Sequence, residues 1–200
     1  MINAARATLL AILFSFTLQA NYLINDHLIS PKAGEVIDKI GAELQEKTGI
    51  HAYVIASNDR LPKRANLYAY VKKYAKSLSE PWVAIVFLPN NKRLGILVSD
   101  PKMKKWYRDE EVKKYAIDIL GSADSNSEQS KYDVAMVQAY SELADELAAH
   151  RGATLEHTIK NESQWLIKII TWLVYLGAIL VFWVYFGRPI YMRIRYGKRK

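Results

Sequence analysis

The longest apolar run of the chain lies near its carboxyl end and constrains the fold more than any other feature. It reads WLIKIITWLVYLGAILVFWVYF from Trp165 to Phe186, with Lys168 as its only charge. Helical residues rise roughly 1.5 Å each, so this run would cover about 33 Å, enough to cross the hydrocarbon layer of a bilayer. As a core helix it would need apolar cover on every face, which a chain of 200 residues can hardly supply. The run therefore predicts a transmembrane helix over 165–187.

The residues that flank this run predict its anchoring and its orientation. Aromatic rings at both ends are typical of membrane interfaces, and long cationic side chains reach the headgroups. The expected interface anchors are Trp165, Lys168, Trp183, Tyr185 and Arg188. The tail 188–200 carries six basic residues and no acidic one, and such tails stay in the cytoplasm. A basic tail can also bind nucleic acid, but beside a span it has a simpler role in fixing the topology.

The first twenty residues have the pattern of a secretory signal. Arg6 precedes an apolar stretch over 7–16, and the segment closes with Leu18-Gln19-Ala20. A charged start, a short apolar centre and a small residue before the cleavage point form the plan of a signal peptide. We therefore expect 1–20 to be a signal peptide that is cleaved after Ala20. The alternatives are an uncleaved anchor and a buried N-terminal helix.

Together these segments predict a single-pass protein of a bacterial-type cytoplasmic (inner) membrane. Its globular domain, 21–152, would lie on the periplasmic side, and a linker over 153–164 would join it to the span. Residues 21–187 carry 21 basic and 20 acidic residues, so the net charge of +8 resides mostly in the tail and no nucleic-acid partner is expected. The absence of cysteine excludes a disulfide framework, a cysteine nucleophile and a thiolate metal site.

Hydrophobic spacing within 21–152 predicts helices that alternate with strands. Ser30-Pro31 is a typical helix start, and Gly49 a typical residue beyond a helix end. The expected elements are helices over 31–48 and 67–78, strands over 50–55, 82–88 and 94–99, a helix that starts near Asp109, and a last helix through Tyr132, Met136, Tyr140, Leu143 and Leu147. This order indicates a small α/β sandwich, a short sheet flanked by helices.

The opening of this domain resembles the TPM domain family. The resemblance rests on Asn25-Asp26 ahead of Leu28-Ile29-Ser30, the amphipathic helix, and the turn Glu46-Lys47-Thr48-Gly49 before a strand. Tyr74-Ala75 and the hairpin over 82–99 extend it, so that it covers about residues 22–150. Many members of this family also carry a signal peptide and a C-terminal span.

The resemblance implies a TPM-like α/β sandwich and two classes of function. One is an accessory role in the assembly, repair or quality control of a membrane complex, because the family is similar to a thylakoid-lumen protein of photosystem II repair. The other is a phosphatase that depends on a divalent cation. Members usually follow the hairpin with a glycine-rich acidic loop, whereas this chain has a basic and aromatic segment over 99–107. Only Asn25, Asp26 and, loosely, Asp100 stand in for acidic positions of the family.

Carboxylates in predicted loops are the candidate ligands for a metal ion. Asp26, Asp59 and Asp100 could meet at one edge of the sheet, with Asn25 beside them, and oxygen ligands of this kind suit Ca²⁺ or Mg²⁺. Aspartate also caps and orders turns, which is the simpler alternative. No phosphate-binding glycine loop or nucleophile elbow is present, and the four histidines are scattered.

A basic and aromatic segment, PKMKKWYR over 101–108, is the candidate contact surface. Lys104, Lys105, Trp106 and Tyr107 could dock onto lipid headgroups or an acidic partner, or the aromatic rings could tuck into the domain and leave a solvated loop. The sequence therefore predicts a membrane-tethered binding or accessory module whose partners are the lipid bilayer and a membrane protein complex. A phosphatase that uses Asp26 and Asp100, and a bare anchor that shapes the envelope, are the alternatives.

Overall fold

The structure, a computed structural model, describes residues 21–25, 27–159 and 163–187. The chain divides into two units, with the boundary between Ile159 and Lys160. The predicted signal peptide, Asp26 and the basic tail with Arg188 lie outside the described residues.

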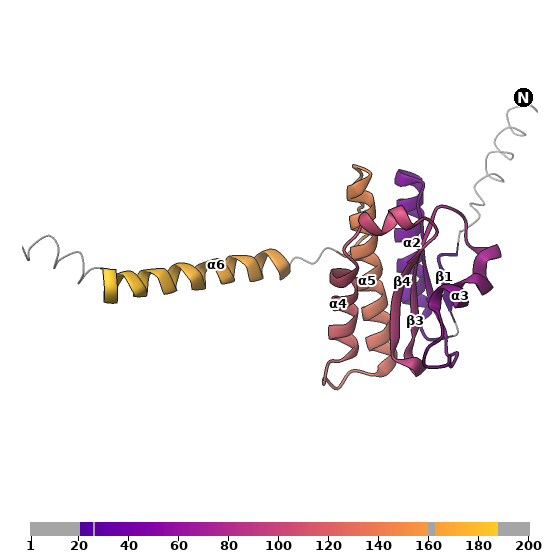
Figure 1. The fold of residues 1–200 in the computed structure, drawn as a ribbon, viewed down its shortest axis with the longest axis horizontal. Coiled ribbons are helices and arrows are strands. Elements are labelled where there is room, and N and C mark those ends of the chain that lie inside the picture. Colours follow the sequence, from indigo (N-terminus) through magenta and orange to yellow (C-terminus); the bar gives the residue numbers. More distant parts are fainter. Residues whose placement is uncertain (1–20, 26, 160–162, 188–200) are drawn as a thin grey trace, which may run out of the picture. The chain divides into compact units, whose positions relative to one another are not determined.

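The first unit is built on a four-stranded sheet in the order β1-β2-β3-β4 (Figure 1). The strands are β1 (Leu23–Asn25), β2 (His51–Ala56), β3 (Trp82–Leu88) and β4 (Arg93–Val98). β1, β2 and β3 run parallel, and β4 returns antiparallel to β3 as the predicted hairpin. The sequence does not predict β1, since three residues are too short to show a strand period; pairing with β2 places Leu23 opposite Val54.

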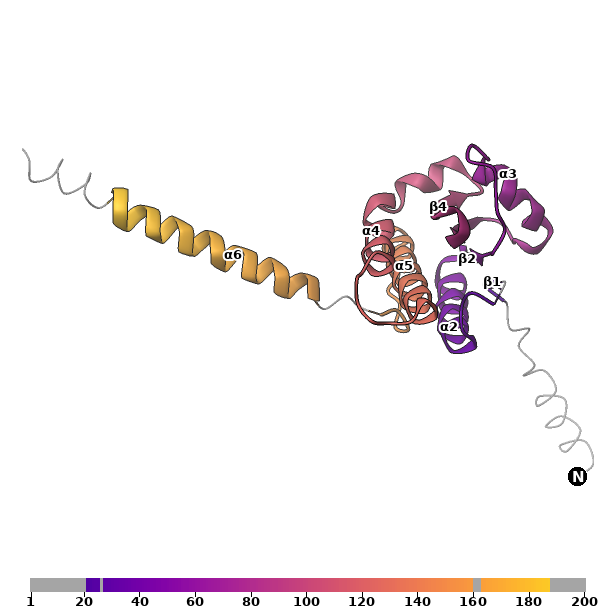
Figure 2. The same cartoon turned by 90° about the horizontal axis from the view of Figure 1, so that it is seen from below.

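Helices cover both faces of this sheet, so the predicted mixed α/β architecture is confirmed. The helices are α2 (Pro31–Thr48), α3 (Leu67–Val71), α4 (Asp109–Leu120) and α5 (Glu128–His150), with short 3-10 helices η1 (Lys72–Ser77), η2 (Pro89–Asn91) and η3 (Pro101–Lys105). α2, α4 and α5 lie on one face and α3 lies on the other (Figure 2). The helix expected over 67–78 is α-helical only as far as Val71 and continues as the tighter η1.

Helix α2 begins and ends where its sequence predicts. The Ser30 hydroxyl accepts a hydrogen bond from the Ala33 backbone N–H at 3.3 Å, and Pro31 is the first helical residue. Gly49 adopts a left-handed conformation with φ of 72°, and its N–H donates to the Gln45 carbonyl at 2.8 Å. This end turns the chain directly into β2.

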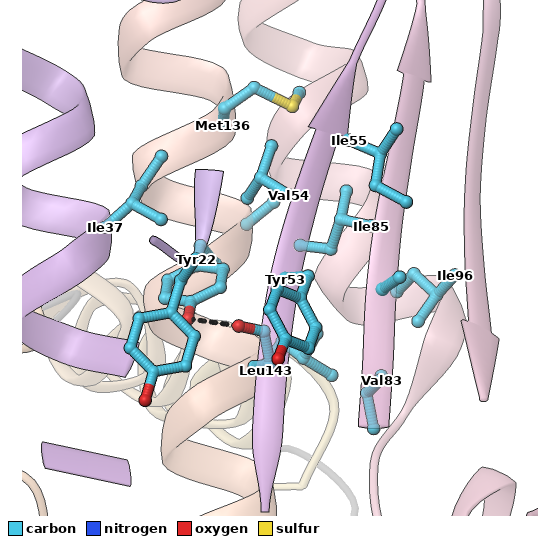
Figure 3. Close-up of a cluster of buried hydrophobic side chains, with 14 of the residues drawn as sticks. Tyr22, Ile37, Tyr53, Val54, Ile55, Val83, Ile85, Ile96, Met136 and Leu143 are labelled. Atoms are coloured by element: carbon cyan, nitrogen blue, oxygen red, sulfur yellow. Dashed lines mark hydrogen bonds between the residues drawn. The ribbon is translucent and has the colours of Figure 1, made fainter. Parts of the chain in front are cut away.

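The core occupies both faces of the sheet: α2, α4 and α5 cover one face, and Tyr70 and Val71 of α3 belong to the same buried cluster. Every residue of β3 is buried, as expected of a strand covered on both faces. Ile37 of α2 and Met136 of α5 belong to the same buried cluster as Val54 of β2 (Figure 3). The buried hydrophobic residues run from Tyr22 to Leu155, so residues 21–159 contain a complete core of their own.

The segment 153–159, part of the predicted linker, packs onto the domain. Leu155 and Thr158 are buried, and the Thr158 hydroxyl donates to Asp145 at 2.8 Å. The Glu43 carboxylate accepts the backbone N–H groups of Glu156 and His157 at 2.8 and 3.0 Å. The folded unit thus extends through Ile159, beyond the predicted boundary at 152.

Of the second unit the structure describes α6 (Ser163–Phe182) and the π-helical turn that follows it, η4 (Trp183–Gly187). Its large hydrophobic side chains from Trp172 to Phe186 are 44 to 72 % exposed. For Trp165 and Lys168 only the helical backbone is described. Within the described residues, no helix combines the length and the apolar character needed to cross a membrane. The transmembrane helix over 165–187 stays a prediction.

Candidate functional site

The predicted cation ligands do not come together in the described residues. Asn25 closes β1, and Asp59 follows the end of β2 at the same edge of the sheet. Because β4 is antiparallel, Asp100 follows it at the opposite edge, beside the start of β3. The prediction that loop carboxylates gather at one edge treats all strands as parallel, which holds for β1, β2 and β3 but not for β4.

Asn25 and Asp100 instead order the turns in which they lie. The Asn25 side-chain oxygen accepts the backbone N–H groups of Leu28 and Ile29, and its amide nitrogen donates to the Ile29 carbonyl at 2.7 Å. The Asp100 carboxylate accepts the Lys102 N–H at 2.9 Å and caps η3. Both contacts are those expected of residues that favour turns. The described residues therefore assemble no cation site around these two side chains.

Asp59 belongs to a hydrogen-bonded cluster beside α3 and η1. One of its oxygens accepts from the Tyr70 hydroxyl and from the Lys73 ammonium, both at 3.0 Å. The hydrogen bond from Lys73, with that from Tyr70, lowers the pKa of the Asp59 carboxyl. The Tyr70 hydroxyl also lies 3.2 Å from that of Tyr74, and burial raises its pKa. This cluster ties the loop after β2 to the helices that follow.

The basic segment 101–108 splits into an inner and an outer side. Met103 and Tyr107 are buried, and burial, with the nearby Asp109, raises the pKa of Tyr107 to about 12. The Trp106 ring is half-buried and stacks on His150, with ring centroids 4.8 Å apart. Lys104 and Lys105 are exposed. Tyr107 is thus buried and Trp106 half-buried against the domain, and the basic side chains of the segment face solvent.

Three glutamates from α4 and α5 form an acidic cluster that the sequence analysis does not identify. Carboxylate oxygens of Glu111, Glu142 and Glu146 lie within 4.8 Å of one another. Burial, with the charge of Glu146, raises the pKa of Glu142. The Arg108 guanidinium pairs with Glu111 and with Glu146, each at 2.6 Å. Because this arginine already bridges two of the acids, the cluster has a structural explanation: it fastens the start of α4 to α5.

The largest described groove lies near the carboxyl ends of the parallel strands and has a volume of about 830 Å³. Its apolar lining is Leu67, Phe87, Leu94, Ile117, Leu120 and Tyr132, with Lys92, Arg93 and Glu128 among the remaining lining residues. Ligands of open α/β sheets commonly bind at this end of the strands. The sequence does not predict this groove, because the residues that line it come from elements far apart in the chain. An apolar floor with a few charges suits an amphipathic group.

Comparisons with known proteins find a solved structure of similar fold. No protein-family model matches the chain, and none of the curated proteins matches it. The chain is similar in structure to the N-terminal domain of a protein from P. gingivalis, solved in solution by NMR. The TM-score is 0.52 at 10 % sequence identity, and the match covers 70 % of this chain and 89 % of that one. At this identity the similarity shows a shared fold alone.

Proposed function

We propose that this protein is a membrane-tethered binding module of the TPM type. In this proposal, the predicted transmembrane segment 165–187 spans the inner membrane with the tail 188–200 in the cytoplasm, and the α/β domain lies on the periplasmic side. There the domain serves as an accessory part of a membrane protein complex, in its assembly, repair or quality control. The TPM-like sequence features over 22–150 support this class of function.

The observation that carries the proposal is the exposure of the second unit. Its large hydrophobic side chains from Trp172 to Phe186 are 44 to 72 % exposed, whereas the domain buries its own core. A continuous apolar surface of this kind marks a membrane or protein contact in a stable protein. Residues 165–186 carry one charge and have bilayer length, so lipid is the cover that we propose.

Alkaline carbonate extraction of membranes tests the tether. The full-length chain should stay in the membrane pellet, and the Leu176→Arg/Leu180→Arg variant should shift to the supernatant. Each arginine costs about 3 kcal/mol at the centre of a span. The matched control, Ile117→Arg/Val134→Arg, adds the same charge at exposed apolar positions of the domain and should pellet like the parent. Release of the unaltered chain, or equal release of both variants, would overturn the proposal.

A further inference from the structure

Helix η3 presents three lysines to solvent in a fixed arrangement. In a 3-10 helix, side chains at i and i+3 lie on the same side. Met103 is fully buried, so the side of η3 that carries it faces the core, and the half-buried Trp106 follows three residues later. Lys102, Lys104 and Lys105 are exposed on the remaining surface. The fold thus directs the ammonium groups outward.

No carboxylate neutralises these lysines within the described part of the chain. Some cations of the domain have acidic partners within 4.0 Å: Lys73 pairs with Asp59, and Arg108 pairs with Glu111 and Glu146. None of the described ion pairs involves Lys102, Lys104 or Lys105. Asp100, the nearest acid in sequence, uses a carboxylate oxygen to cap η3. These three lysines of the described chain therefore carry their charge without an ion-pair partner within 4.0 Å.

Arg151, just beyond α5, extends the positive surface. Its guanidinium carbon lies 4.7 Å from the centroid of the Trp106 ring, a cation–π contact that holds the charge beside η3. Arg151 is exposed. We define Lys102, Lys104, Lys105 and Arg151 as the basic face.

We propose that the basic face binds the anionic phospholipid headgroups of the membrane that tethers the chain. This proposal rests on the proposed membrane tether. None of the described grooves is lined by residues of the basic face, so it offers point charges on an open surface rather than a shaped pocket. Such a surface matches a plane of phosphates, which lysine contacts without a fixed geometry.

The length of the connection strengthens this attraction. Ile159 ends the domain and Ser163 begins α6, and the chain between them spans at most about 14 Å when fully extended. A tether this short gives the domain a high effective concentration at the headgroups. The basic face itself attracts phosphates within a Debye length of about 8–10 Å, and the tether adds to a binding that the free domain also shows.

Vesicle co-sedimentation of residues 21–159, which have their own core and lack α6, tests the basic face. The probes are vesicles of pure phosphatidylcholine and vesicles with one third phosphatidylglycerol. Binding should require the anionic lipid and weaken with salt. The Lys102→Gln/Lys104→Gln/Lys105→Gln variant should bind on the order of 100-fold more weakly at low ionic strength, at roughly fivefold per lysine.

The matched control neutralises three cations at the opposite edge of the sheet. Lys63→Gln/Arg64→Gln/Lys92→Gln removes the same charge from exposed positions and should bind like the parent domain. Equal loss in both variants would show that net charge alone drives binding and would overturn the proposal. Binding to neither vesicle type, or equally to both, would also overturn it. Because α6 is absent from this experiment, none of these results bears on the membrane tether.

Discussion

Glu43 shows how one residue of α2 fastens the end of the domain. Its side chain is 8 % exposed, and it accepts hydrogen bonds from the Lys47 ammonium at 2.7 Å and from the His157 ring at 2.9 Å. Its carboxylate also accepts hydrogen bonds from the backbone N–H groups of Glu156 and His157. Burial alone would raise the pKa of this carboxyl, but these hydrogen bonds outweigh burial and lower the pKa to about 2.

Replacing Glu43 should make the domain less stable in a way that depends on pH. The folded-state pKa lies below the ordinary value of 4.5, so this carboxylate stabilises the fold above about pH 4.5, and its contribution is lost as the pH falls toward 2. Urea denaturation of residues 21–159 should show Glu43→Gln less stable by about 2 kcal/mol at pH 7. The difference should shrink as the pH drops below 4.5.

Glu46→Gln is the matched control, because Glu46 lies on the same helix and is exposed. Its free energy of unfolding should stay within about 0.5 kcal/mol of the parent. A difference between Glu43→Gln and the parent that stays constant from pH 7 to pH 3 would contradict this role of Glu43.

The sequence predicts the contacts of helix-capping residues better than those of the candidate site residues. Ser30 and Gly49 act through local geometry, which the neighbouring sequence determines. The place of Asp100 follows from the direction of β4. The acidic cluster forms because α4 packs on α5. Such long-range placement leaves no trace in the spacing of a single sequence.

Two glycines of α2 lie close to side chains from other elements. A Cβ atom on Gly41 would lie 2.5 Å from the Tyr22 ring and 2.6 Å from the Tyr140 hydroxyl. That hydroxyl is buried and donates to the Ala52 carbonyl of β2 at 2.8 Å. On Gly34 the nearest atom would be the end of the Leu23 side chain, at 3.0 Å. Tyr22 and Tyr140, which a Cβ atom on Gly41 would meet, are held in place by packing. The end of the Leu23 side chain, which a Cβ atom on Gly34 would meet, can rotate away.

Alanine at these two positions should therefore change the stability by different amounts. Both changes gain about 1 kcal/mol of helix propensity. Gly41→Ala should still be destabilised by about 2 kcal/mol, because Tyr22 and Tyr140 must move, whereas Gly34→Ala should stay within about 1 kcal/mol of the parent. Urea denaturation of residues 21–159 measures both. Equal stability of the two variants would show that this packing is looser than the structure indicates.

The sequence predicts elements with a strong local pattern and does not predict short ones. α2 and β3 show a helical period and a continuous apolar run, and both are confirmed. The three residues of β1 form a strand through their parallel pairing with β2, which the sequence of β1 does not show. The docking of 153–159 follows from the buried Glu43 on α2, which no property of that polar segment reveals.

At the scale of the whole molecule, the chain has a domain with a buried core and a helix with exposed apolar side chains. The domain has a core of buried hydrophobic residues between Tyr22 and Leu155, whereas the large hydrophobic side chains of α6 from Trp172 onward are exposed. The central claim of the proposed function is that the bilayer separates the domain from the tail 188–200. A direct test must locate both parts in the same membrane.

Single-cysteine labelling makes this test directly, because the chain has no cysteine of its own. Ser125→Cys places a thiol at an exposed position between α4 and α5, and Gly197→Cys places one in the tail. A membrane-impermeant maleimide added to intact spheroplasts should label Ser125→Cys and should label Gly197→Cys only after lysis. Labelling of Gly197→Cys in intact spheroplasts, or protection of Ser125→Cys until lysis, would contradict the account.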